Sequence, residues 1–337
     1  MDEVHWSTRR RSISRPGFWQ LSVTLCSTLI AVGAYLVIVH TLDPQSLGIY
    51  TFVQWLASVA LPMIGIGTSR RSSYQIIEIL RRETERQAAG IFHFLWYRQW
   101  WNILLYCGIY LALATLLARI YGALTSLFLL LAGLAAIPLL LSNIASIVLR
   151  SLRRSNLLTM LHLCGAISLL LFISIASQSN GEQVAAFLLA SSLAAMLTLI
   201  LAVVCVAKHL PLRNAIQPGF YMQRRILQSL KCSLLLFMLD FITWQHGELL
   251  LLACWRSPAE IGFYALSASI SAATMRLAPT FLFYWMLPLY LRYIPGKHFA
   301  NTYDAFVKTS CAIVFLAVPI CIVMMVACPF IITTCLG

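Results

Sequence analysis

A small group of polar residues interrupts two neighbouring apolar stretches, and its spacing is suited to binding an anion. Asp240, Trp244 and Glu248 follow one another at intervals of four residues, which places them within about 80° of one another on one helix face. Gln245 lies beside that face, and Arg276 interrupts the next apolar stretch. A guanidinium group binds phosphate oxygens in a bidentate geometry. These five residues are therefore candidates for a binding site.

Asp240 and Arg276 are predicted to lie at similar depths if the two stretches form antiparallel helices. Counted from the same helix ends, they lie roughly 10 Å and 8 Å deep. One interpretation is a structural ion pair that lets two charged side chains enter an apolar environment. In the other, Asp240 holds Arg276 until an anionic substrate displaces it. For Glu248 the sequence offers Arg256 as a cationic partner, and it leaves two roles open: proton coupling or contact with substrate hydroxyl groups.

The composition places these residues in a membrane. Of the 337 residues 60% are hydrophobic and only 10% are charged, whereas an ordinary soluble domain has about 25% charged residues. A soluble globule and a disordered chain are both excluded. The ten cysteines show no metal-binding spacing, so neither a metal, a cofactor nor a disulfide framework is expected. The predicted class is an all-α, polytopic membrane protein, and no enzymatic chemistry is predicted.

Nine stretches are long and apolar enough to cross a bilayer, which requires about 20 residues each. They are residues 18–40, 48–68, 99–117, 126–149, 157–176, 184–207, 233–254, 261–283 and 310–336.

The basic residues predict how these helices are oriented. All but Arg119, Arg256 and Arg276 of the 24 Lys and Arg residues fall in the N-terminal tail and in alternate connections. Because cytoplasmic loops collect positive charge, the N-terminus is predicted to be cytoplasmic. The net charge of +13 is then a topology signal, and nucleic-acid binding is not expected.

Two turns on the predicted outer side share one pattern at an offset of 214 residues. Proline favours the start of a helix, glycine allows close helix approach, and tyrosine suits the membrane interface. Two unrelated membrane turns could share this chemistry, but both copies follow an outward span and open an inward one. The pattern therefore predicts an internal repeat. The shared residues are Pro44, Gly48 and Tyr50 in the first turn and Pro258, Gly262 and Tyr264 in the second.

The repeat predicts two parallel halves with a substrate cavity between them, because an even number of spans separates the copies. The expected organisation is a basic tail (1–15), a six-helix lobe (16–207), a cytoplasmic connector (208–231) and a partial second lobe (232–337). The second lobe holds three predicted spans where six would complete it. We therefore expect the sequence to be a truncated version of a protein at least about 100 residues longer.

Several segments resemble the polysaccharide biosynthesis family, which contains the O-antigen and capsule flippases of the multidrug/oligosaccharidyl-lipid/polysaccharide exporter superfamily. The resemblance extends over nearly the whole chain but is diffuse, and no single motif identifies a substrate. It implies two helix bundles that move an isoprenoid-pyrophosphate-linked oligosaccharide across the bacterial inner (cytoplasmic) membrane by alternating access, for lipopolysaccharide O-antigen export. The similar segments are residues 42–50, 65–67, 70–71, 244–248, 287–290 and 328–330.

The resemblance also implies roles for the polar residues. Arg276 would contact a phosphate of the carrier lipid, and Trp244, Gln245 and Glu248 would contact sugar hydroxyl groups. The implied partners are the lipid-linked glycan, membrane lipids and polysaccharide assembly proteins. Four further arginines would either line the cytoplasmic mouth of the cavity or only set the topology: Arg70, Arg71, Arg98 and Arg150.

Three other functions compete with a flippase. A cation-coupled multidrug exporter of the same superfamily often carries an acid in its first helix, whereas residues 18–39 hold no charge. A glycan polymerase or ligase generally needs an extramembrane platform, and the predicted outer loops have only six to eight residues. The third alternative is a non-transporting remnant that acts through partners.

Overall fold

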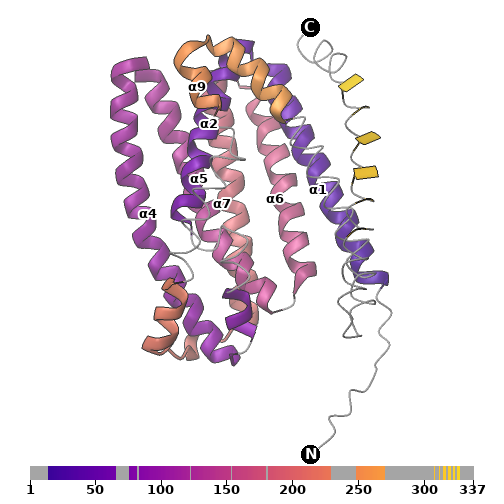
Figure 1. Ribbon diagram of the computed structural model, residues 1–337, viewed down its shortest axis with the longest axis vertical. Coiled ribbons are helices and arrows are strands. Elements are labelled where there is room, and N and C mark those ends of the chain that lie inside the picture. Colours follow the sequence, from indigo (N-terminus) through magenta and orange to yellow (C-terminus); the bar gives the residue numbers. More distant parts are fainter. Residues whose placement is uncertain are drawn as a thin grey trace, which may run out of the picture.

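The computed structural model shows an all-α protein whose long helices lie side by side (Figure 1). Four candidate residues, Asp240, Trp244, Gln245 and Arg276, lie outside the residues that the structure describes, as does the Arg70–Arg71 pair. The described residues are 14–65, 76–81, 83–121, 123–152, 154–179, 181–228 and 248–269, with isolated positions between 307 and 326.

The first two thirds of the chain form six long helices, and three shorter helical segments follow in the described part. Five of the long helices, α1 and α4 to α7, are long and apolar enough to span a membrane. The bounds are α1 Ser14–Thr41, α2 Pro44–Ile64, α4 Glu85–Tyr121, α5 Ala123–Ser151, α6 Ser155–Ala176, α7 Gln183–His209 and α9 Glu248–Trp255; residues 76–81, 220–228 and 258–269 are also helical.

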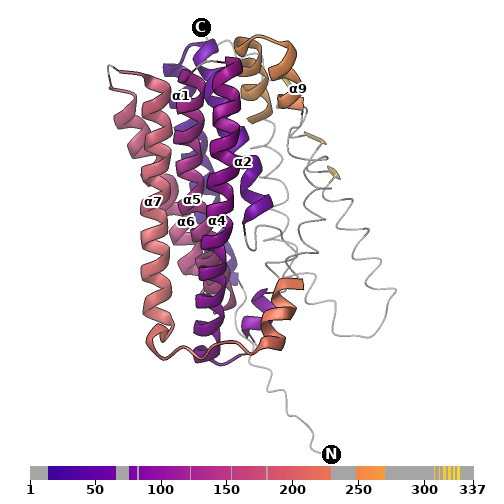
Figure 2. The same cartoon turned by 90° about the vertical axis from the view of Figure 1, so that its left-hand side faces the viewer.

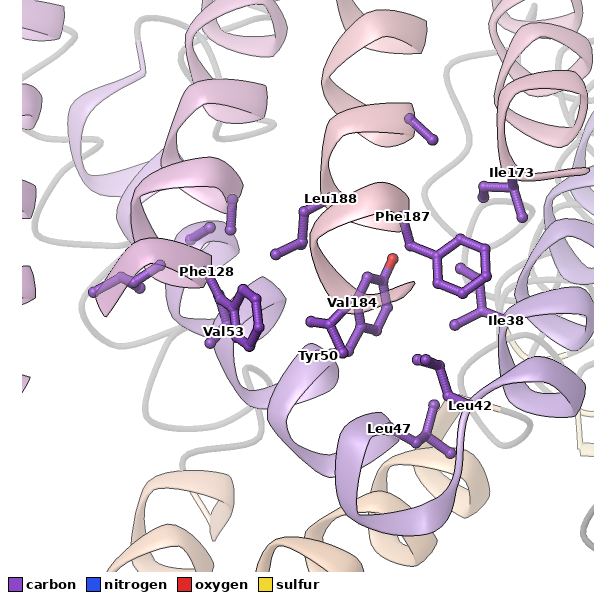
Figure 3. Packing of buried hydrophobic residues seen from close by; sticks show 14 of the residues in the cluster. Ile38, Leu42, Leu47, Tyr50, Val53, Phe128, Ile173, Val184, Phe187 and Leu188 are labelled. Atoms are coloured by element: carbon purple, nitrogen blue, oxygen red, sulfur yellow. The ribbon is translucent and has the colours of Figure 1, made fainter. Parts of the chain in front are cut away.

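Helix α5 is the centre of the bundle, because it contacts α2, α4, α6 and α7, while α1 packs along α6. Buried alanines on α5 and α7, such as Ala132, Ala136 and Ala190, let the backbones approach closely, as small residues do in membrane helix packing. Figure 3 shows the core near one end of the bundle, where Tyr50, Phe187 and other buried side chains of α1, α2, α5, α6 and α7 meet.

The outer surface of α4 is apolar along most of its length. Trp101, Leu104, Leu105 and Ile109 are each more than half exposed. A surface of this kind is unfavourable in water but suits the acyl chains of a bilayer. Together with the five candidate spans, it supports a multi-pass membrane protein.

The connector and the first outer turn lie at opposite ends of the bundle (Figure 1). The turn between α1 and α2 is at one end, and the start of α4, the end of α5 and the connector are at the other. Figure 2 shows the connector running from the end of α7 past the lower end of α4. The placement of the two ends relative to the cytoplasm stays a prediction from the basic residues.

The connector is fixed to α4 through its backbone. The N–H of Ile216 donates a hydrogen bond of 3.0 Å to the carbonyl oxygen of Arg86, and the His93 Nε2 atom lies 3.3 Å from the carbonyl oxygen of Leu212. Gly90 makes this approach possible, because a Cβ atom there would lie 1.7 Å from the carbonyl oxygen of Ile216. Ile226, in the helical segment 220–228, is completely buried against the same end of the bundle.

Replacement of Gly90 with valine is therefore expected to displace the connector. Forcing a larger side chain into a packed site costs about 1–3 kcal/mol, so trypsin should cut at the exposed Arg213 about tenfold faster or more, in vesicles that present this end. Gly108→Val is the matched control, because nothing lies within 4 Å of a Cβ at that position on the same helix. Equal cleavage of both variants would contradict the docking.

Candidate functional site

The helices that follow the two repeat turns begin with the same cap. The Asp43 Oδ2 atom accepts a hydrogen bond of 3.3 Å from the N–H of Ser46, and the Ser257 Oγ atom accepts one of 3.5 Å from the N–H of Glu260. In both turns the cap precedes the repeat proline, at the helix position where a missing N–H is tolerated. The hydrogen bonds from Ser46 also lower the pKa of the Asp43 carboxyl group.

The two turns cross each other at their glycines. A Cβ atom on Gly48 would lie 1.7 Å from the carbonyl oxygen of Pro258 and 3.1 Å from the nitrogen of Gly262. A Cβ atom on Gly262 would lie 2.6 Å from the carbonyl oxygen of Pro44 and 3.2 Å from the nitrogen of Gly48. Each glycine thus faces the proline carbonyl and the glycine of the other copy, which is the reciprocal pattern of contacts around a twofold axis.

Apolar packing surrounds the crossing one helical turn further along. Phe52 packs against both the core of the six-helix bundle and the cluster formed by Trp55, Leu249 and Ile261, and it stacks on Trp55 of its own helix with ring centroids 6.2 Å apart. Leu266, which stands 214 residues after Phe52, is fully buried in the core of the six-helix bundle. The second copy therefore places Leu266 against the six-helix bundle, while Phe52 of the first copy lies where the two clusters meet.

Glu248 is joined to the second repeat by a hydrogen bond. The hydroxyl group of Tyr264 donates to the Glu248 Oε1 atom. Glu248 lies seven residues, about 10 Å, before the end of α9 at Trp255. The partner suggested by the sequence, Arg256, instead lies 3.6 Å from Glu260 in an exposed ion pair.

The other predicted site residues are only partly placed. Arg98 on α4 and Arg150 at the end of α5 are exposed, towards the end of the bundle that holds the connector. The predicted Asp240–Arg276 pair falls outside the described residues and stays a prediction. The described residues contain no group of three or more His, Cys, Asp or Glu that could hold a metal ion.

Sequence reasoning missed the bond between Tyr264 and Glu248 and the burial of Leu266 in the core of the six-helix bundle. The offset of 214 residues contained a signal for the contact of Leu266, since it pairs this residue with the apolar Phe52 once the repeat is extended beyond its motif. The parallel relation of the complete halves stays a prediction, because much of the second half lies outside the described residues.

Comparisons with known proteins give a fold but no family. No family model and no curated protein matches the chain. A solved structure described as the inward-facing conformation of a multidrug resistance MATE family transporter of the MOP superfamily is similar, with a TM-score of 0.63 and 13% sequence identity. The match covers 93% of this chain and 74% of that transporter. At this identity the likeness establishes a shared fold and nothing finer.

Proposed function

We propose that the protein is an alternating-access transporter that moves an isoprenoid-pyrophosphate-linked oligosaccharide across the bacterial inner membrane, with its N-terminus in the cytoplasm. The observation that carries the proposal is the reciprocal crossing of Gly48 and Gly262, in a chain that shares its fold with a transporter. Parallel repeats, as the sequence predicts for this chain, hold a substrate cavity at their interface, and transport occurs by movement of one half against the other. No covalent bond of the substrate is made or broken.

Two features favour a glycan lipid as the substrate: the first helix has no acidic residue, and the second half carries polar residues within its predicted spans. Helix α1 contains no Asp or Glu, although multidrug exporters of the resembling superfamily often carry an acid there. In the second half, Arg276 would bind the carrier phosphate, with Asp240 holding it until the substrate arrives. Trp244 and Gln245 would contact the sugars, and Glu248 would either join them or carry the coupling proton. The resemblance of residues 42–50 and 244–248 to polysaccharide flippases supports the same substrate class.

A cation-coupled multidrug exporter is the second candidate. The similar solved structure is described as a multidrug resistance transporter, and Glu248 supplies an acid within a predicted span. In this function Glu248 would bind the coupling cation, and the second half of the chain would take the role that the first helix has in the resembling exporters.

Transport in vesicles separates these functions. The purified chain is reconstituted with a fluorescent isoprenoid-pyrophosphate oligosaccharide on one side, and a membrane-impermeant glycosidase added to the other side measures its arrival. We expect glycan release faster than in protein-free vesicles, and no release above that background for a neutral glycolipid without the pyrophosphate. Transport of an organic dye cation without transport of the glycan lipid would establish the multidrug function. If neither compound is transported, the result would support the third alternative, a non-transporting remnant that acts through partners.

A further inference from the structure

We propose that the crossing of Gly48 and Gly262 is the outer gate of the transporter, where the two halves separate whenever the cavity opens to the outside. The inference rests on the proposed alternating-access function and deepens it by naming the contact that controls access. The crossing lies at the end of the bundle opposite the connector (Figure 1), which the basic residues predict to be the outer end.

The crossing is a contact of backbone with backbone. The carbonyl oxygen of Pro258 occupies the place that a side chain of residue 48 would take, and the carbonyl oxygen of Pro44 does nearly the same at residue 262. Glycine is less favourable than alanine inside a helix. Glycine at the same repeat position in both helices is therefore explained by the close backbone contact that it allows between them.

The contacts around the crossing are apolar packing contacts, which two rigid halves can break and form again. Leu266 of the second half is buried in the core of the six-helix bundle, and Leu47 and Ile261 are buried in the two clusters that Phe52 contacts. Rotation of domains about such an interface replaces one set of packed contacts with another. A closed state with this geometry admits no side chain at either glycine, so a side chain there favours the separated state.

The gate is also linked to a candidate site residue. Tyr264, which donates a hydrogen bond to Glu248, stands two residues after Gly262 on the same helical segment, 258–269. Separation of Gly262 from Gly48 therefore moves the helix that holds Tyr264 relative to the six-helix bundle. Because Glu248 and Tyr264 both belong to the second half, opening of the gate moves this hydrogen-bonded pair as a unit relative to the six-helix bundle.

Cysteine labelling in intact cells tests the gate without any substrate. The reporter is Ile261→Cys in a chain whose ten native cysteines are replaced, and a membrane-impermeant maleimide is added outside. We expect Gly48→Val and Gly262→Val each to raise the labelling rate of this buried position about tenfold or more, because they destabilise only the closed state. The matched controls Gly33→Val and Gly108→Val, where nothing lies within 4 Å of a Cβ, should leave the rate unchanged.

Two results would overturn the gate. Unchanged labelling in valine variants that reach normal amounts in the membrane would show that the crossing does not control access. If the valine variants do not accumulate, Gly48→Ala and Gly262→Ala are measured, since their Cβ atoms still meet carbonyl oxygens at 1.7 and 2.6 Å. Failure of the alanine variants to accumulate would show a permanent joint of the fold and overturn the proposal, as would unchanged labelling.

The labelling result is independent of the substrate. If labelling rises in the variants but the glycan lipid is not moved by the parent protein, the gate stands and the proposed substrate is wrong. If the parent moves the glycan lipid and the variants are labelled no faster than the controls, the substrate stands and the gate is wrong.

Discussion

Replacement of Arg276 with alanine is expected to abolish translocation of the glycan lipid while leaving the amount of protein in the membrane close to that of the parent. A guanidinium group at bilayer depth is costly to insert and is expected to serve a function. A phosphate is its best anionic ligand, since both groups form two parallel charge-assisted hydrogen bonds. Removing one partner of such a buried pair costs about 2–5 kcal/mol, which corresponds to at least about a thirtyfold loss of transport. The reconstituted vesicle assay measures this loss.

A charge-neutral double variant separates this role from a structural ion pair. If Asp240 and Arg276 only satisfy each other, Arg276→Gln alone leaves a buried carboxylate unpaired and lowers the abundance of the protein. Adding Asp240→Asn would then restore both abundance and transport. If Arg276 binds phosphate, the double variant reaches normal abundance and still fails to transport. Recovery of transport in the double variant would therefore exclude phosphate binding by Arg276.

The apolar pattern predicts the helices in the interior of the bundle well. Three of the observed helices are Ala123–Ser151, Ser155–Ala176 and Gln183–His209, and they correspond to the predicted spans 126–149, 157–176 and 184–207. The reason is physical: a spanning helix must satisfy its backbone internally, so the apolar run sets its length.

Helix α4 shows where the apolar pattern fails. Its predicted span begins at residue 99, whereas the helix begins at Glu85. One side of its additional turns is buried in a cluster with residues 76–80, the ends of α5 and α7 and the connector, where Ala89 and Ile91 are nearly or fully buried. Such an extension depends on a contact with a segment more than 100 residues later, at Ile216, and hydropathy contains no information on that contact.

The sequence predicts two copies of a turn at the candidate site, but it does not predict that the two turns contact each other. The sequence places Gly48 and Gly262 at equivalent repeat positions, and small residues indicate that some helix approaches closely. Which helix approaches is decided by tertiary packing. The same limit applies to Glu248: counting along a helix suggests Arg256 as its partner, whereas Tyr264, 16 residues away beyond a turn, is the residue that donates to it.

Replacement of Glu248 with glutamine is expected to remove the response of transport to an imposed pH gradient. In the part of the chain that the structure describes, Glu248 is the acid that lies furthest inside a predicted span, and it is exposed rather than enclosed in the core. An acid in that position can exchange a proton with a water-filled cavity, and intramembrane acids of this kind serve as proton relays. Its bond to Tyr264 connects the protonation of Glu248 to the helix that carries Gly262.

Tyr264→Phe distinguishes proton coupling from the other roles of Glu248. This variant loses the hydroxyl donor, and a hydrogen bond to a charged group contributes about 1.5–3 kcal/mol, but it keeps the carboxyl group. If Glu248 carries the coupling proton, Tyr264→Phe slows transport and retains its gradient response, whereas Glu248→Gln transports at one rate with or without the gradient. Glu260→Gln is the control, since it removes an exposed acid beside Arg256. The contrary outcome is that Glu248→Gln and Tyr264→Phe both transport more slowly and both still respond to the gradient. This outcome would exclude coupling through Glu248. It would assign Glu248 to holding Tyr264 or to contacting sugar hydroxyl groups.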